Sequence, residues 1–60
     1  MMEYYVSFEE AKAEKFFRVI DLFDDVEVVE VEHGKHYSEA ILASKDHDSI
    51  RKIGAIMKML

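Results

Sequence analysis

The sequence predicts an α+β fold: one small domain with the element order β-α-β-β-α. Apolar residues alternate in three segments, as in strands with one buried face, and recur at helical spacing in two others. Half of the 60 residues are hydrophobic. With two glycines and no proline the chain has no linker-like segment, and without cysteine it has no disulfide framework. We therefore expect a single domain over residues 1–60, with a three-stranded, largely antiparallel sheet and two helices packed on one face of it.

The N-terminal part of the chain predicts a strand followed by a helix. Over residues 2–7 the even positions are apolar or aromatic, so their side chains are expected to face inward. Ser7 and Glu10 match a capping box, in which each side chain bonds to the backbone amide of the other residue, and we expect the helix to begin there. Five apolar side chains form its predicted buried stripe: Ala13, Phe16, Phe17, Ile20 and Phe23.

The C-terminal part predicts a hairpin followed by a second helix. Two β-rich runs over residues 26–32 and 37–43 are separated by Gly34, which supplies a turn, although the register of the pairing stays open. Asp46 then caps a helix whose apolar residues share one face. These residues are Ile50, Ile53, Met57 and Leu60.

The alternation of the first β-rich run fails at Val28 and Val29. A β-bulge there restores the phase. With the bulge, Val26, Val29 and Val31 would all face inward. Glu27, Glu30 and Glu32 would all face outward. Without a bulge, one of the two central valines needs cover from another subunit or from the terminal helix. We favour the bulge; in either arrangement Glu30 and Glu32 lie side by side, and Glu27 joins them only with the bulge.

The charge of the chain is unevenly distributed along its length. Residues 1–32 carry ten acids and three bases, whereas residues 33–60 carry three acids and five bases. Nucleic acid is therefore disfavoured as a partner, because binding to phosphates needs clustered lysine and arginine. No apolar run approaches the roughly 20 residues that span a bilayer, and the N-terminus lacks a signal-peptide pattern. We expect a cytoplasmic protein that does not bind membranes.

Catalysis and metal binding have little support in the sequence. The chain has no thiol nucleophile, no glycine-rich phosphate loop and no GxSxG motif. An acid-base pair of carboxyls needs an apolar pocket to separate the two pKa values, and so short a chain rarely encloses one. His33 and His36 flank Gly34, but a metal site needs a third ligand. We expect no enzymatic activity, no cofactor and no metal, and we assign no role to the two histidines.

The acidic residues before and within the middle strand predict a negative surface. They are Asp24, Asp25, Glu27, Glu30 and Glu32. Such charges also occur simply to keep sheet edges from pairing. Clustered charge of one sign nevertheless steers association with an oppositely charged partner, and Tyr5 or Tyr37 would add apolar anchoring. We hypothesise a small acidic module that binds a basic surface of a partner protein, as an inhibitor or regulator of the virus-encoded or antitoxin type.

The order β-α-β-β-α resembles a ferredoxin-like unit that lacks its last strand. The resemblance covers the whole chain but implies only a fold, because no motif accompanies it. A missing fourth strand would leave a sheet edge for a second subunit or a partner's strand. The alternative function is therefore a homo-oligomeric regulatory or small-ligand-binding module of this type, such as a homodimer. A third is nucleic-acid binding through Arg51, Lys52 and Lys58 of the last helix.

Overall fold

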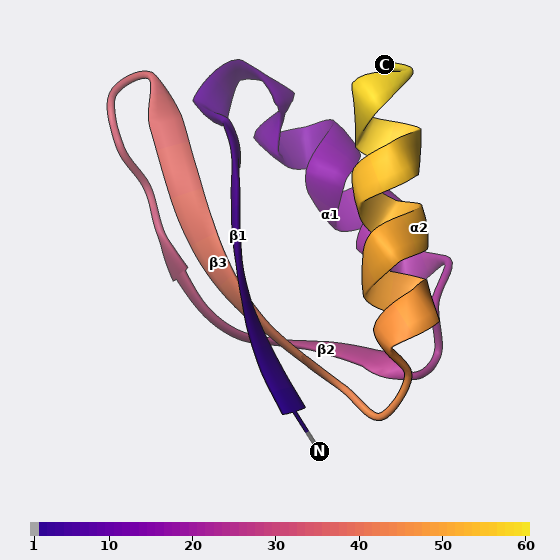
Figure 1. The fold of residues 1–60 in the computed structure, drawn as a ribbon. Helices are drawn as coiled ribbons and strands as arrows, with labels where there is room; N and C mark the ends of the chain where they lie inside the picture. Colours follow the sequence, from indigo (N-terminus) through magenta and orange to yellow (C-terminus); the bar gives the residue numbers. More distant parts are fainter. Residues whose placement is uncertain (1) are drawn as a thin grey trace.

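The computed structural model describes residues 2–60 and confirms the order β-α-β-β-α (Figure 1). The strands are β1 (Met2–Glu9), β2 (Val26–Glu32) and β3 (Tyr37–Ser44), and the helices are α1 (Ala13–Asp21), preceded by the 3-10 turn η1 (Glu10–Lys12), and α2 (His47–Lys58). The strands form one antiparallel sheet in the order β1-β3-β2. Figure 1 shows both helices on one side of this sheet, as predicted, with no helix over the other side. Over residues 2–60, neither helix is long and apolar enough to cross a bilayer.

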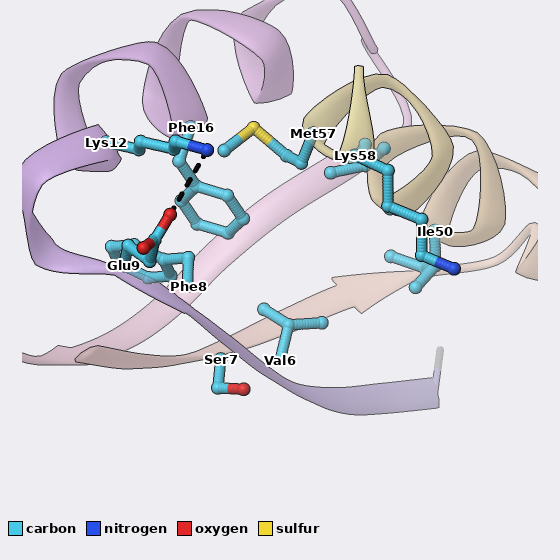
Figure 2. Close-up of a pocket in the computed structure, with 11 residues that line it drawn as sticks. Val6, Ser7, Phe8, Glu9, Lys12, Phe16, Ile50, Met57 and Lys58 are labelled. Carbon is cyan, nitrogen blue, oxygen red and sulfur yellow. Dashed lines mark ion pairs between the residues drawn. The ribbon is translucent and has the colours of Figure 1, made fainter. Parts of the chain in front are cut away.

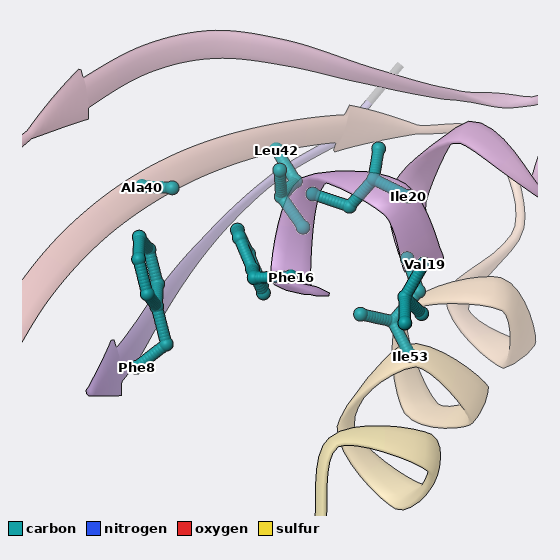
Figure 3. Packing of buried hydrophobic residues seen from close by; sticks show 7 residues of the cluster. All are labelled: Phe8, Phe16, Val19, Ile20, Ala40, Leu42 and Ile53. Atoms are coloured by element: carbon teal, nitrogen blue, oxygen red, sulfur yellow. The ribbon is translucent and has the colours of Figure 1, made fainter. Parts of the chain in front are cut away.

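The hydrophobic core lies between the two helices and the sheet (Figure 3). It consists of Phe8, Phe16, Val19, Ile20, Ala40, Leu42 and Ile53. Phe8 of β1 stacks on Phe16 of α1 with 4.1 Å between ring centroids, and Phe17 meets Phe8 edge-on. Leu42 of the central strand is completely buried. The apolar stripe predicted for the first helix is therefore confirmed, although its last member, Phe23, lies beyond the end of α1.

The predicted capping box is wrong because β1 continues to Glu9, past the predicted end at residue 7. Phe8 has to reach the core and pairs with Ser38, which keeps the backbone extended through this region. Ser7 consequently lies within the strand. Glu10, its predicted partner, instead contacts side chains of the β2-β3 connection and β3.

The predicted bulge is present in β2, but its inward residue differs from the prediction. Val28 pairs with Leu42 and Glu30 with Ile41, which leaves Val29 as the extra residue. Val28, and not Val29, therefore shares the face of the buried Leu42, because the phase of the strand is kept until after Val28. Val28 and Val29 are 36% and 50% exposed, so the helices cover this part of β2 poorly.

Gly54 gives a test of how α2 is packed. A Cβ built on Gly54 would meet no atom within 4 Å. Glycine within a helix is less favourable than alanine by about 0.8–1 kcal/mol. We expect Gly54→Ala to raise the free energy of unfolding by about 1 kcal/mol in urea denaturation. Gly34→Ala is the matched control and should destabilise the chain, because its Cβ would collide with the backbone oxygen of Tyr37. A less stable Gly54→Ala variant would contradict this packing.

Candidate functional site

The sheet face opposite the helices carries most of the acidic side chains of the strands. Tyr5 pairs with Ile41, and Ile41 with Glu30, so these three side chains form a row across the face. The rows on either side are Glu3, Ala43 and Glu27, and Ser7, Glu39 and Glu32. Glu9 lies opposite Tyr37 in a further row, but it is paired with Lys12. We call the surface formed by the five other glutamates, which make no ion pair over residues 2–60, the acidic face: Glu3, Glu27, Glu30, Glu32 and Glu39.

The glutamates of the acidic face make no ion pair within the described part of the chain. None of the three strands contains a lysine or an arginine. The ion pairs found over residues 2–60 use other carboxylates, those of Glu9, Glu10, Glu14 and Asp48. Glu32 lies directly opposite Glu39, a like-charged pair that costs on the order of a few tenths of a kcal/mol. The face thus carries a negative field directed to solvent.

Aromatic and apolar side chains accompany the glutamates on this face. An open hollow of about 210 Å³ is lined by Tyr5, Glu30, Glu32, Glu39, Ile41 and the neighbouring Ala40. Tyr5 is 75% exposed, and Tyr37, two residues before Glu39 on the same strand, is 67% exposed. Tyrosines of this kind are enriched at protein interfaces because they combine an apolar ring with a polar tip. The acidic face therefore offers contact area as well as charge.

The structure brings five of the seven residues predicted from the sequence onto this face. They are Tyr5, Glu27, Glu30, Glu32 and Tyr37. Asp24 and Asp25 lie in the turn before β2, where both are exposed and line a separate open hollow with Glu27 and Lys45. The sequence analysis missed Glu3 and Glu39. The alternation within each strand was visible, but the pairing that places β1 and β2 on either side of β3 was not.

Asp25 is anchored on the helix side of the sheet. Its carboxylate accepts hydrogen bonds from the hydroxyls of Ser49, at 2.6 Å, and Ser44, at 3.3 Å, and both serines are buried. The hydrogen bond from Ser49 lowers the pKa of Asp25, helped by Ser44 and by the positive charge of Lys52 and opposed by burial. Asp25 thereby joins the start of β2 to the end of β3 and the first turn of α2.

A second polar cluster lies at the opposite end of β3. The hydroxyl of the buried Ser38 donates to the Glu10 carboxylate, and His33 Nδ1 lies 2.7 Å from the same carboxylate. The contacts with His33 and Ser38 lower the pKa of Glu10. In a nucleophilic triad the histidine lies between serine and acid, whereas here the acid lies between the other two. The cluster therefore differs from such a triad, and its contacts join η1 to the hairpin.

Metal ligands do not converge in the described chain. Over residues 2–60, no three histidine, aspartate or glutamate side chains are placed to hold an ion. His33 faces Glu10, and His36 contributes its backbone oxygen, which accepts the Glu10 amide at 2.9 Å. The two histidines predicted to flank the turn are thus placed next to η1.

Asp25 predicts a pH dependence of stability. Because folding lowers its pKa, the carboxylate stabilises the folded chain above the unfolded-state pKa of about 3.9, and this contribution is lost as the pH falls through the folded-state pKa. The melting temperature of Asp25→Asn should therefore lie furthest below that of the wild type near neutral pH and converge with it below about pH 4. Asp24→Asn should stay close to the wild type, because the neighbouring Asp24 takes no part in the hydrogen bonds from Ser44 and Ser49. If the melting temperature of Asp25→Asn lay equally far below that of the wild type at all pH values, this role of the Asp25 carboxylate would be contradicted.

Comparisons with protein-family models, with curated proteins and with solved structures find no match for this chain.

Proposed function

We propose that the chain is a small acidic protein-binding module, an inhibitor or regulator, that binds a basic surface of a partner protein through its acidic face. The observation that supports this proposal is the placement of five glutamates on one sheet face whose strands carry no basic side chain. Their mutual repulsion disfavours the free chain. Lysine and arginine side chains of a partner would offset that repulsion, and the field would steer the encounter.

Glu39 separates this proposal from the alternative that the acids only protect the sheet edges. Glutamates on an edge strand prevent pairing with other chains, and Glu27, Glu30 and Glu32 on β2 fit that role. Glu39, however, lies on the central strand β3, whose two edges are already paired. A carboxylate there protects no edge, yet it extends the charge of the neighbouring strand across the face.

The hollow on the acidic face is the place where we expect a basic side chain of the partner to bind. Glu30, Glu32 and Glu39 line it together with Tyr5 and Ile41. A lysine or arginine of the partner that enters this hollow would have carboxylates on several sides and could stack its charged group on the Tyr5 ring. Tyr37, exposed on the same face, would add apolar contact at its margin.

The basic side chains of α2 form no comparable surface for nucleic acid. Arg51 pairs with Asp48 at 3.3 Å between nitrogen and oxygen, and Lys52 lies close enough to Asp25 to affect its pKa. Two of the three cations proposed for phosphate binding thus have an acidic neighbour. These contacts favour a protein partner.

Charge reversal on the acidic face should separate binding from folding. We expect the double variant Glu30→Lys/Glu32→Lys to fold with equal or slightly higher stability, because residue 32 then faces Glu39 with opposite charge. The same variant should lose capture of a basic partner from cell lysate, which the wild type should bind at about 50 mM salt and release at about 300 mM salt. The measurement combines urea denaturation with affinity capture and identification of the bound protein.

A matched control places the same charge change on the helix side. Glu14→Lys/Asp21→Lys alters two exposed positions of α1 and should retain the captured protein. With the purified partner, the acidic-face variant should raise Kd about tenfold or more, whereas the control should leave it nearly unchanged. Equal Kd values for both variants would refute binding through the acidic face.

A further inference from the structure

The free edge of β1 differs from the free edge of β2 in having no bulge. Each outer strand pairs only with β3, so each presents unpaired backbone N–H and C=O groups on its other side. β2 carries a bulge at Val29 and three glutamates along its length. β1 pairs with β3 without interruption from Met2 to Glu9 and contains no proline and no lysine. Bulges, prolines and charges are the usual means of blocking an edge, and β1 lacks the first two.

An apolar groove runs beside this edge on the helix side of the sheet. Its volume is about 430 Å³. The apolar side chains that line it come from β1, α1 and α2: Val6, Phe8, Phe16, Ile50, Ile53 and Met57. Figure 2 shows Val6 and Ile50 on opposite sides of the cavity, whereas Ser7 points away from it. An added strand would therefore direct every second side chain into an apolar space.

The charge of the acidic face determines which side chains would suit the other side of such a strand. Side chains that alternate with those in the groove would lie beside Glu3, Tyr5 and Ser7, on the acidic face. Glu3 makes no ion pair within residues 2–60. Two lysines line the groove on the helix side, Lys12 and Lys58. Lys12 is paired with Glu9 at 3.1 Å and donates to the Leu60 backbone oxygen. The side chains that enter the groove should therefore be apolar and carry no positive charge. Positive charge on the added strand would thus be complementary to the face that it extends.

We propose that the edge of β1 and the adjoining groove bind an extended segment of the partner protein in which apolar and basic residues alternate. The segment would add to the sheet as a fourth strand, with its apolar side chains between β1 and α2 and its basic side chains on the acidic face. This inference rests on the proposed function for the sign of the charge that it assigns to the segment. It adds the element of the partner that is recognised and the place where it binds.

Charge disfavours a second copy of the chain at this position. A second copy that paired its own β1 there would extend the sheet with an acidic face of its own. Like charges would then adjoin across the new edge. An extended segment with basic side chains avoids this repulsion.

Gly54 allows the groove to be filled without disturbing the core. It lines the groove, and a Cβ at this position would meet no atom within 4 Å. Gly54→Leu should therefore leave the fold intact while its side chain occupies the space for the segment. Ala55→Leu is the matched control, because Ala55 is exposed on the same helix and does not line the groove.

The probe is a fluorescein-labelled peptide of about seven alternating lysine and valine residues, a length that matches a typical strand. Its binding is measured by fluorescence anisotropy, and its position by the amide shifts of the chain in NMR spectra. We expect shifts along β1, a Kd raised about tenfold or more by Gly54→Leu and unchanged by Ala55→Leu, and weaker binding of a glutamate-valine peptide.

The outcomes separate this inference from the proposed function. Binding that survives Gly54→Leu but is lost in Glu30→Lys/Glu32→Lys would overturn the groove site and leave binding through the acidic face standing. Binding that is lost in Gly54→Leu but is insensitive to salt and to charge reversal would support the groove site and contradict the proposed function. Absence of peptide binding, or a dimer of the chain that Gly54→Leu dissociates, would overturn the inference.

Discussion

The apolar side chains of this chain cover only one face of its sheet, and the other features of the structure depend on that constraint. Phe8 stacked on Phe16, with Leu42 buried beneath the helices, holds α1 and α2 to the same side. Because both helices lie on that side of the sheet, the opposite face remains in contact with solvent. A short chain has no further element with which to cover it. The residues that alternate with the core therefore form the exposed surface of that face.

The sequence was sufficient to predict the strands and helices, but it was insufficient to predict how the strands pair. Alternation and helical spacing are local properties, so the strands, the helices and the bulge near Val29 were predictable. Ser7 and Glu10 were misassigned because burial of Phe8 and the contacts of Glu10 with Ser38 and His33 are long-range effects. The contribution of Glu39 to the acidic face depends on β3 lying between the other strands, which no local pattern specifies.

The two edges of the sheet have different chemistry, and this asymmetry connects the acidic face with the groove. β2 combines an interrupted pairing with alternating carboxylates, and both features discourage a further strand. β1 combines uninterrupted pairing with an apolar groove on one side and the acidic face on the other. A partner that adds to β1 would contact both surfaces at once. Charge would then favour the encounter, while the groove would favour one orientation of the segment.

The central claim is that a partner protein covers the acidic face, and mapping that contact on the chain tests it most directly. NMR cross-saturation from an unlabelled partner to the labelled chain identifies the side of the sheet that is covered. The account predicts strong saturation transfer to the amides of Tyr5, Glu39 and Ile41, which lie on the three-stranded face. Saturation confined to the solvent-exposed residues of α1 and α2, such as Arg18 and Arg51, would contradict it.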